Sequence, residues 1–535
     1  MTTQIKRKMT LSAASLMLFL STTISAPEKE EPKDEKSTDQ TAEIYRWLKT
    51  TAEVVSTVQS KSFRNVDFER FLQDALKASV SGVDSHSTFI ENYEEITDAT
   101  AGKFSGIGAS MIAKPREDDA LVIIEVLDGS PAQKAGMKAG DKIVAVNDEK
   151  LRGLSLDEVV NKIKGKRGTK VRLKVIRDKK PMEFVVTRDI IKDQSSYCYH
   201  FEKQNVYCFI LKNFTENSTN QMKDLLKRAQ KDSSCKGIIL DLRSNPGGVL
   251  GAAIDMTSLF LPKGSLITST RNNKNELVRE YRTTKEQFLT TAHLPIFVLI
   301  NNFTASASEI MAGALEYHST KLSEDKETRD KAPMVIIAGT STFGKGSVQE
   351  VIPVSNGCAL KLTTMLYFLP NDTSIQEKGV NPDITIKPKL IPAKETKWIT
   401  ELYGKESTIK HHITAEEVEK IRSGQKPELT SKIDEQEAKR QRETELKREK
   451  EEENEDNPLK SDEYDEKTGK KLSFKEKQER SVARNHQIQS CVNMINLLHM
   501  ASKCQPEAID TRKNTIEFLK TNFVTDETTV VKRLK

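Results

Sequence analysis

The sequence has no apolar run long enough to cross a membrane. A membrane-spanning helix needs roughly 20 consecutive apolar residues, and nothing of that length occurs in the 535 residues. Charge is nearly balanced, with 84 basic and 78 acidic side chains and a net charge of +6, whereas nucleic-acid binders gather basic residues on one face. A multi-pass membrane protein is therefore excluded, and no nucleic-acid partner is expected. The length predicts roughly three or four structural units.

Short cysteine spacings are also missing. The six cysteines form no CxxC pair, and of the eight histidines only His411 and His412 are adjacent, so we expect neither a metal site nor a cofactor. Cys198 and Cys208 flank a polar turn, which predicts a hairpin. They form either a disulfide in an oxidising compartment or two buried thiols. The sequence does not decide whether Cys491 and Cys504 pair.

Residues 1–25 have the pattern of a secretory signal peptide. Basic residues at positions 6–8 precede the apolar stretch Met9–Leu20, and small residues follow at Ser21 and Ser25. The alternative is an amphipathic start that is not cleaved. We expect an exported protein in the periplasm of a Gram-negative bacterium or an equivalent extracytoplasmic space, without a membrane span once this segment is removed.

Composition divides the remaining chain into four regions. The first has apolar residues at helical spacing, the second alternates short strands with one clear helix, and the third holds the most apolar strands. The fourth is densely charged, and apolar positions return near its end as a helical cap on the core. The expected order is an N-terminal helical region (26–101), a β-rich module (102–192), an α/β core (193–390) and a charged helical region (391–535).

The β-rich module resembles a PDZ domain, a fold that binds peptides. The resemblance rests on Phe104–Ala109 (FSGIGA), on Gly129–Ala132 (GSPA) and on Gly140–Ile143 (GDKI). The turn through Gly106, Ile107, Gly108 and Ala109 can direct successive N–H groups at a carboxylate, and the peptide would add as a strand to an exposed edge. The alternative is a β-module that only spaces its neighbours.

Two turns of the core can carry chemistry. An apolar strand, Gly237–Arg243, ends in Asn245–Gly248 (NPGG), where backbone N–H groups can form an oxyanion hole; the same letters also make an ordinary turn. A second strand is followed by Ala305-Ser306-Ala307-Ser308 at the start of a helix. A serine in such a turn suits a nucleophile, although Ser306 or Ser308 could each serve only as an N-cap.

A third turn places Lys345 between two glycines directly after an apolar strand. A lysine in a partly dry site loses its proton more readily and can act as a general base. A phosphate-binding loop is excluded because Gly346 stands where a Ser or Thr should follow the lysine. The alternative is a surface lysine in a glycine turn, without a catalytic role.

In this order the motifs resemble those of the carboxy-terminal processing peptidases, or tail-specific proteases, a serine–lysine family. The resemblance covers about residues 60–390. It implies Ser306 as nucleophile, Lys345 as base and Gln349 as the residue that orients the lysine. It further implies an oxyanion hole from N–H groups of Gly247, Gly248 and Ala307, and a crotonase-like α/β core.

The sequence departs from the family pattern in two places. Many relatives have an acidic residue eleven positions after the nucleophile, where Tyr317 stands here beside Glu316. Residues 319–332 form a charged insertion, which we expect to be an exposed loop.

The sequence is compatible with two functions. The first is a serine endopeptidase that acts on exported proteins with exposed C-terminal tails, working as a homo-oligomer or with an adaptor. The second is a catalytically inactive PDZ scaffold that binds C-terminal peptides.

Overall fold

The computed structural model describes residues 35–523 with internal gaps. The gaps are residues 102, 115–119, 128, 152–155, 178–179, 193, 290–293, 326, 329–332, 389–405, 407–411 and 425–473. The expected signal peptide and most of the charged stretch before residue 480 therefore lie outside the described residues. Backbone contacts divide the chain into two units, residues 1–72 and 73–535, and each is described by itself.

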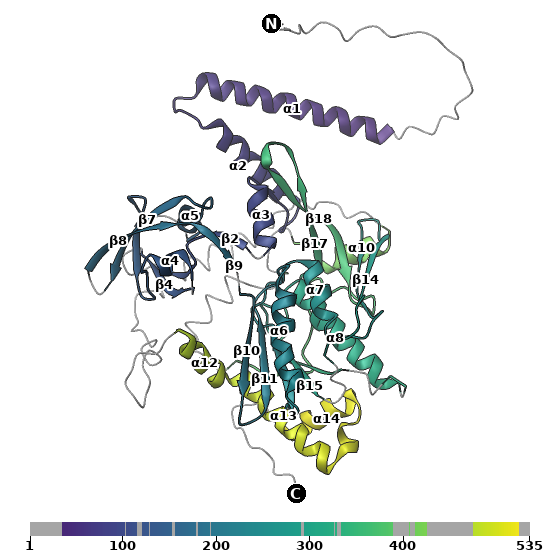
Figure 1. Ribbon diagram of the computed structural model, residues 1–535. Coiled ribbons are helices and arrows are strands. Elements are labelled where there is room, and N and C mark those ends of the chain that lie inside the picture. The colour runs from purple at the N-terminus through teal and green to yellow at the C-terminus, as the bar shows by residue number, and fades with distance from the viewer. Residues whose placement is uncertain are drawn as a thin grey trace, which may run out of the picture. The chain divides into compact units, whose positions relative to one another are not determined.

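The first unit consists mainly of helix α1 (Glu35–Lys61), after which α2 (Phe68–Ser81) begins. Figure 1 shows α1 as one long helix. Large apolar side chains on it stay exposed, among them Ile44 and Trp47, each 60% accessible. The N-terminal region is thus helical as expected, with α3 (Tyr93–Thr100) following.

One segment of this region differs from the expectation. Thr88–Ile90 forms strand β1, which pairs antiparallel with β18 (Ala359–Phe368). Three residues are too few to show a period in the sequence, and the strand exists because a core strand offers its edge. The N-terminal region therefore contributes directly to the core.

The β-rich module folds as expected. Its main sheet has the order β3-β4-β5-β7-β8 with β6 attached to β5, and β2 pairs separately with β9. The apolar side chains that alternate along β7 lie in one core with Ile123 and Val159. The strands and helices are β2 (Lys103–Gly106), β3 (Ala109–Lys114), β4 (Ala120–Val126), α4 (Pro131–Lys134), β5 (Lys142–Val146), β6 (Glu149–Lys150), α5 (Leu156–Ile163), β7 (Lys170–Arg177), β8 (Lys180–Thr187) and β9 (Asp189–Lys192).

The core is built on a six-stranded sheet of order β10-β11-β12-β15-β16-β19. β10 and β11 form an antiparallel hairpin, and the other neighbours are parallel. Parallel strands are buried on both faces, which explains their nearly continuous apolar runs. The strands are β10 (Ser196–Phe201), β11 (Val206–Leu211), β12 (Gly237–Asp241), β15 (Pro295–Ile300), β16 (Met334–Gly339) and β19 (Ile384–Thr385).

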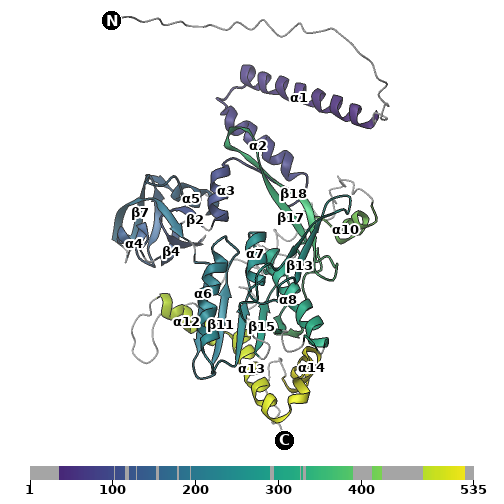
Figure 2. The same cartoon turned by 45° about the vertical axis from the view of Figure 1, so that its right-hand side comes forward.

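Helices cover both faces of this sheet (Figures 1 and 2). Side chains of α6 (Ser218–Lys231), α7 (Leu250–Thr257) and α8 (Ala307–Glu324) fill one apolar cluster, and those of α13 (His486–Cys504) and α14 (Arg512–Asn522) fill the other. The expected C-terminal helical cap is therefore confirmed. The arrangement is a multidomain α/β fold. The further helices α10 (Ala415–Arg422) and α12 (Phe474–Arg484) lie in the C-terminal third.

A second sheet, β1-β18-β13-β14 with β17 paired to β18, completes the core. It joins β17 (Ser347–Pro353), which follows the lysine loop, to β18 in an antiparallel pair. The remaining strands are β13 (Leu266–Arg271) and β14 (Leu277–Arg282).

The expected hairpin of Cys198 and Cys208 is confirmed, and both thiols are free. Cys198 lies opposite Phe209, so the two cysteines point to opposite faces of the sheet, and Cys208 is fully buried in the cluster beneath α13. Cys491 is buried in that same cluster while Cys504 is exposed and free. The buried-thiol interpretation holds for Cys208.

The charged insertion differs in part from the expected loop. Its first six residues, 319–324, continue helix α8, and the Ser319 hydroxyl donates to Pro333 O at 2.7 Å. Residues 329–332 lie outside the described residues. Among the described helices, none combines the length and apolar character that crossing a membrane requires.

Candidate active site

Ser306 stands at the start of α8 in a strained backbone conformation. Its φ of +57° and ψ of −118° are unusual for a residue with a Cβ, and such strain persists only where the surroundings enforce it. Ser306 is half-buried, whereas the Ser308 hydroxyl is buried and donates to Asn245 O at 3.1 Å. The structure thus separates the two serines: Ser308 is tied into the turn.

Lys345 lies in the loop between β16 and β17. Burial, together with the positive charge of Lys361, lowers the pKa of its ammonium to about 8, against the opposing charges of Glu406, Glu309 and Asp84. An amine with this pKa is partly unprotonated near neutral pH, which is what a general base requires.

The buried carboxylate of Glu309 joins the serine turn to the lysine loop. Its Oε2 accepts from Ser306 N at 2.7 Å and from Lys345 N at 2.9 Å, and its Oε1 accepts from Gly344 N and from the Thr342 hydroxyl. Burial raises the pKa of Glu309 to about 7, against the four hydrogen bonds that favour the charged form. The carboxylate therefore holds both loops in one geometry.

Tyr367, from β18, makes a second link between the same residues. Its hydroxyl contacts the carbonyl oxygens of both Ser306 and Lys345. Full burial raises the pKa of Tyr367 well above its ordinary value, so the phenol keeps its proton and remains a donor. The backbones of Ser306 and Lys345 are therefore neighbours at both their N–H and their carbonyl groups.

The turn after β12 packs directly against Ser306. A Cβ at Gly247, where φ is +97°, would lie 2.8 Å from Ala305 O and 2.9 Å from Ala307 N. At Gly248, with φ +141°, a Cβ would collide with the backbone of Phe214. Both glycines are needed because the chain adopts positive φ while touching its neighbours.

The candidate oxyanion donors are not equivalent. The Gly247 N–H donates to Asn245 Oδ1 at 2.9 Å, and is therefore occupied. For the N–H groups of Gly248 and Ala307, no hydrogen-bond partner occurs among the described residues. Asn245 is fully buried, and its carbonyl oxygen accepts from Ala305 N at 3.0 Å. Asn245 therefore fixes the turn after β12 to the turn that holds Ser306.

Gln349 lies on β17 next to a β-bulge between Val348 and itself. Its Nε2 donates to Ser347 Oγ at 2.9 Å and to Thr363 Oγ1 at 3.1 Å. A bulge redirects a side chain away from the regular pleat. The structure places Gln349 four residues beyond Lys345 on a strand that leaves the lysine loop.

In the β-rich module, the segment from Gly106 to Ala109 leads from β2 into β3, which is an edge strand. The carbonyl oxygens of Ile107 and Gly108 accept from Ala132 N and Leu127 N, whereas the N–H groups of both have no partner among the described residues. Gly108 has φ +73° and touches Ser130, the N-cap of α4. A free nest of N–H groups thus adjoins an open strand edge.

Sequence reasoning missed Glu309, Tyr367 and Asn245. Glu309 reads as the third helical residue of a capping box, and Asn245 as a turn residue. Only Tyr367 carries no local signal at all, because its partners lie 61 and 22 residues away.

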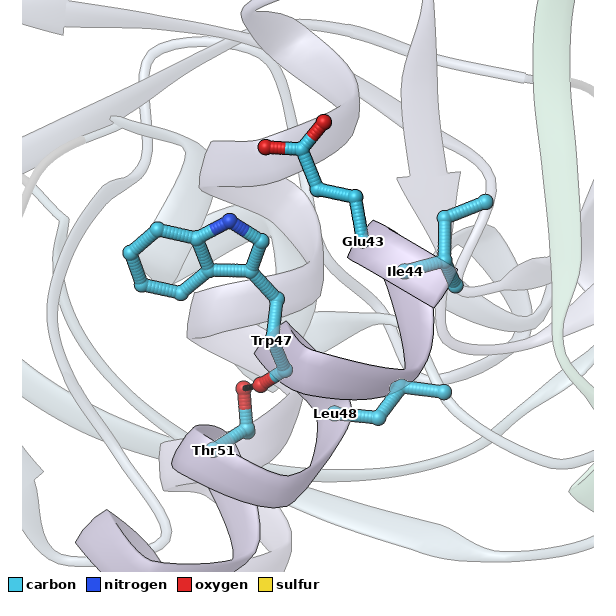
Figure 3. Close-up of a pocket in the computed structure, with 5 residues that line it drawn as sticks. All are labelled: Glu43, Ile44, Trp47, Leu48 and Thr51. Carbon is cyan, nitrogen blue, oxygen red and sulfur yellow. Dashed lines mark hydrogen bonds between the residues drawn. The ribbon is translucent and has the colours of Figure 1, made fainter. Parts of the chain in front are cut away.

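The first unit has a hollow on helix α1. It is lined by Glu43, Ile44, Trp47, Leu48 and Thr51, all of helix α1 (Figure 3).

An α/β core that unites a strained serine with a lysine of lowered pKa is typical of a serine hydrolase. Comparison with known proteins agrees: residues 208–386 match the peptidase family S41 and residues 122–177 match the PDZ domain. The carboxy-terminal-processing protease of Bartonella bacilliformis is 33% identical over 361 residues, 66% of this chain and 78% of the relative. The chain belongs to peptidase family S41 and is a serine protease that carries a PDZ domain.

Other matches cover similar parts of the chain. A probable CtpA-like serine protease of Staphylococcus epidermidis is 30% identical over 344 residues, 63% of this chain and 65% of the relative. The solved photosystem II D1 C-terminal processing protease is 23% identical, with a TM-score of 0.38 over 67% of this chain and 92% of that chain.

Proposed function

We propose that this protein is an exported endopeptidase that selects substrates by their C-terminal tails and cleaves them with Ser306 and Lys345. The observation that carries the proposal is the shared anchoring of these two residues: Glu309 Oε2 accepts from both N–H groups, and the Tyr367 hydroxyl contacts both carbonyl oxygens. A half-buried serine and a lysine of lowered pKa are thereby kept in one site.

The proposed mechanism uses Ser306, Lys345 and the backbone donors beside them. The neutral amine of Lys345 takes the proton of Ser306 Oγ as that oxygen attacks the scissile carbonyl. The N–H groups of Gly248 and Ala307 stabilise the oxyanion, and each such donor is worth about 3 kcal/mol. The lysine ammonium then protonates the leaving amine, and water hydrolyses the acyl-enzyme by the same steps in reverse.

The PDZ domain supplies substrate selection in this proposal. A substrate tail would add as a strand to the open edge of β3, with its terminal carboxylate on the N–H groups near Ile107 and Gly108. Export rests on the basic and apolar pattern of residues 1–25. It is tested by sequencing the N-terminus of the mature protein from fractionated cells; a protein that starts at Met1 in the cytoplasm would contradict it.

Digestion of casein and of a peptide-tagged protein tests the catalytic proposal. Wild type should cleave both, while Ser306→Ala and Lys345→Ala should fold normally and cleave neither. Ser308→Ala serves as the matched control, because its hydroxyl is committed to Asn245 O. Full activity of Ser306→Ala would refute the assignment, and an inactive wild type that still binds tails would favour the scaffold function.

A further inference from the structure

The segment before β1 makes a buried hydrogen-bond cluster beside the lysine loop. Asp84 is only 6% exposed, and its Oδ1 accepts from His86 N at 2.8 Å, from Ser87 N at 2.9 Å and from the Thr363 hydroxyl at 3.0 Å. Its Oδ2 accepts from the Ser87 hydroxyl. Every hydrogen bond that the structure shows at this carboxylate is one that it accepts.

This arrangement fixes the direction of the Thr363 hydroxyl. A hydroxyl has one hydrogen to donate, and in Thr363 that hydrogen points at Asp84. The oxygen of the hydroxyl is therefore an acceptor toward its other neighbour, Gln349 Nε2, at 3.1 Å.

The direction of the hydroxyl in turn fixes the amide of Gln349. With Nε2 donating to both Ser347 Oγ and Thr363 Oγ1, both amide hydrogens are used and Oε1 is left as the acceptor. Turning the amide over would set Oε1 against a hydroxyl that has no hydrogen to give, which is unfavourable in a partly buried site.

We propose that Asp84 is a positioning residue for the catalytic base: through the Thr363 hydroxyl it fixes the Gln349 amide so that Oε1 is the oxygen left to accept a hydrogen bond from Lys345 Nζ. The inference rests on the proposed function of Lys345. A fixed acceptor orients the lysine amine toward Ser306 and favours its charged form, so that the relay affects both the turnover rate and the pKa of the lysine.

The relay is contributed by a segment that lies before the PDZ domain in the chain. Asp84 and Ser87 precede β1, and β1 pairs with β18, the strand that carries Thr363. The Thr363 N–H donates to Ser87 Oγ at 3.0 Å. The groups whose charge acts on Lys345 are Lys361, Glu406, Glu309 and Asp84 itself, so a substitution of Thr363 tests the relay without removing any of these charges.

The experiment compares Thr363→Val with Thr364→Val in the full-length protein. Thr363→Val keeps the shape but removes the relay, and should lower kcat roughly tenfold with little change in KM. The acidic limb of its rate–pH profile should move to lower pH because the ammonium loses an acceptor. Thr364→Val is the matched control, since the buried Thr364 hydroxyl has no hydrogen-bond partner in the part of the chain that the structure describes. Thr363→Ser should restore both kcat and the profile.

Two further variants make the outcome decisive. In a Gln349→Ala background, Thr363→Val should cause no additional loss, because the relay acts only through the amide. Asp84→Asn, whose amide can also donate, should reproduce the lowered kcat. Wild-type kcat in Thr363→Val, additive losses with Gln349→Ala, or a loss matched by Thr364→Val would each overturn the relay. If Lys345→Ala were active, the proposed function itself would fail instead.

Discussion

The backbone N–H groups of Ser306 and Lys345 donate to the same atom, Glu309 Oε2, at 2.7 and 2.9 Å. One buried carboxylate therefore sets the spacing of the nucleophile and the base. Its other oxygen accepts from Thr342 and Gly344, so all the hydrogen bonds that described residues make to this carboxylate come from the two catalytic turns.

Glu309→Gln should uncouple these turns. The amide keeps the size of the carboxylate but brings two donor hydrogens against groups that are themselves donors. We expect kcat to fall at least a hundredfold and the free energy of unfolding to drop by about 2–4 kcal/mol, as for buried donors left unsatisfied. Steady-state kinetics and urea denaturation measure the two effects.

Glu316→Gln is the control for that variant. Glu316 lies on the same helix, and burial raises its pKa to about 7 as well. The guanidinium of Arg512 lies 3.9 Å from its carboxylate, and Arg512 is not a residue of the catalytic turns. Equal losses of kcat in the two variants would show that Glu309 has no special role.

The pH dependence of activity should follow the lysine. The pKa of Lys345 is lowered to about 8 by burial, and only the unprotonated amine can act as base. Activity should therefore be half-maximal near pH 8, rise to its full value at higher pH and fall as the pH drops below 8, in the rate–pH profile of a short peptide. Glu309, with a pKa of about 7, becomes protonated as the pH falls further and should steepen the decline.

Lys345→Arg separates base chemistry from charge in the same assay. A guanidinium does not lose its proton in proteins, so this variant should be inactive at every pH. An active Lys345→Arg variant, or a wild-type profile that stays flat from pH 6 to 9, would contradict a lysine base.

The sequence predicted the strands of the core because its parallel strands are buried on both faces and read as unbroken apolar runs. The turns after β12, β15 and β16 were also predicted, because Asn245–Gly248, Ser306 and Lys345 each follow such a run directly. Strand β1 was not predicted, because three residues show no period. The partner of Thr88 in the sheet, Lys361, lies far along the chain.

For a related reason, the contacts that fix the geometry of the site could not be predicted from the sequence. Glu309 binds groups 33 to 36 residues away, and Thr363 meets Asp84 across 279 residues. A local pattern indicates which residues have useful chemistry, but the direction of a hydroxyl or the sharing of one oxygen depends on tertiary packing.

Gly247→Ala should disturb the nucleophile without touching its side chain. The new Cβ would lie 2.8 Å from Ala305 O and 2.9 Å from Ala307 N, at a φ of +97°. We expect kcat to fall at least tenfold, together with a stability loss of roughly 1–3 kcal/mol from strain.

Gly251→Ala is the control for Gly247→Ala. A Cβ there meets nothing within 4 Å and the position is helical, so alanine should be neutral or slightly stabilising. Parallel thermal melts and kinetics measure both variants, and equal behaviour would contradict the close packing.

The free carboxylate of a substrate tail should determine binding to the PDZ domain. The N–H groups of Ile107 and Gly108 have no partner among the described residues, and they stand at the start of the edge strand β3. An amidated C-terminus removes the negative charge that such a nest binds. We expect amidation of a model peptide to weaken its Kd by roughly tenfold or more, since hydrogen bonds to a charged group contribute about 1.5–3 kcal/mol. Fluorescence anisotropy with Ser306→Ala protein measures this without cleavage.

The Gly108→Ala substitution should weaken binding of the peptide with a free carboxylate in the same way. Its Cβ would meet Ser130 Cβ at 2.5 Å and displace the turn. If amidated and free peptides bound equally, the tail would be recognised by its side chains and not by its end.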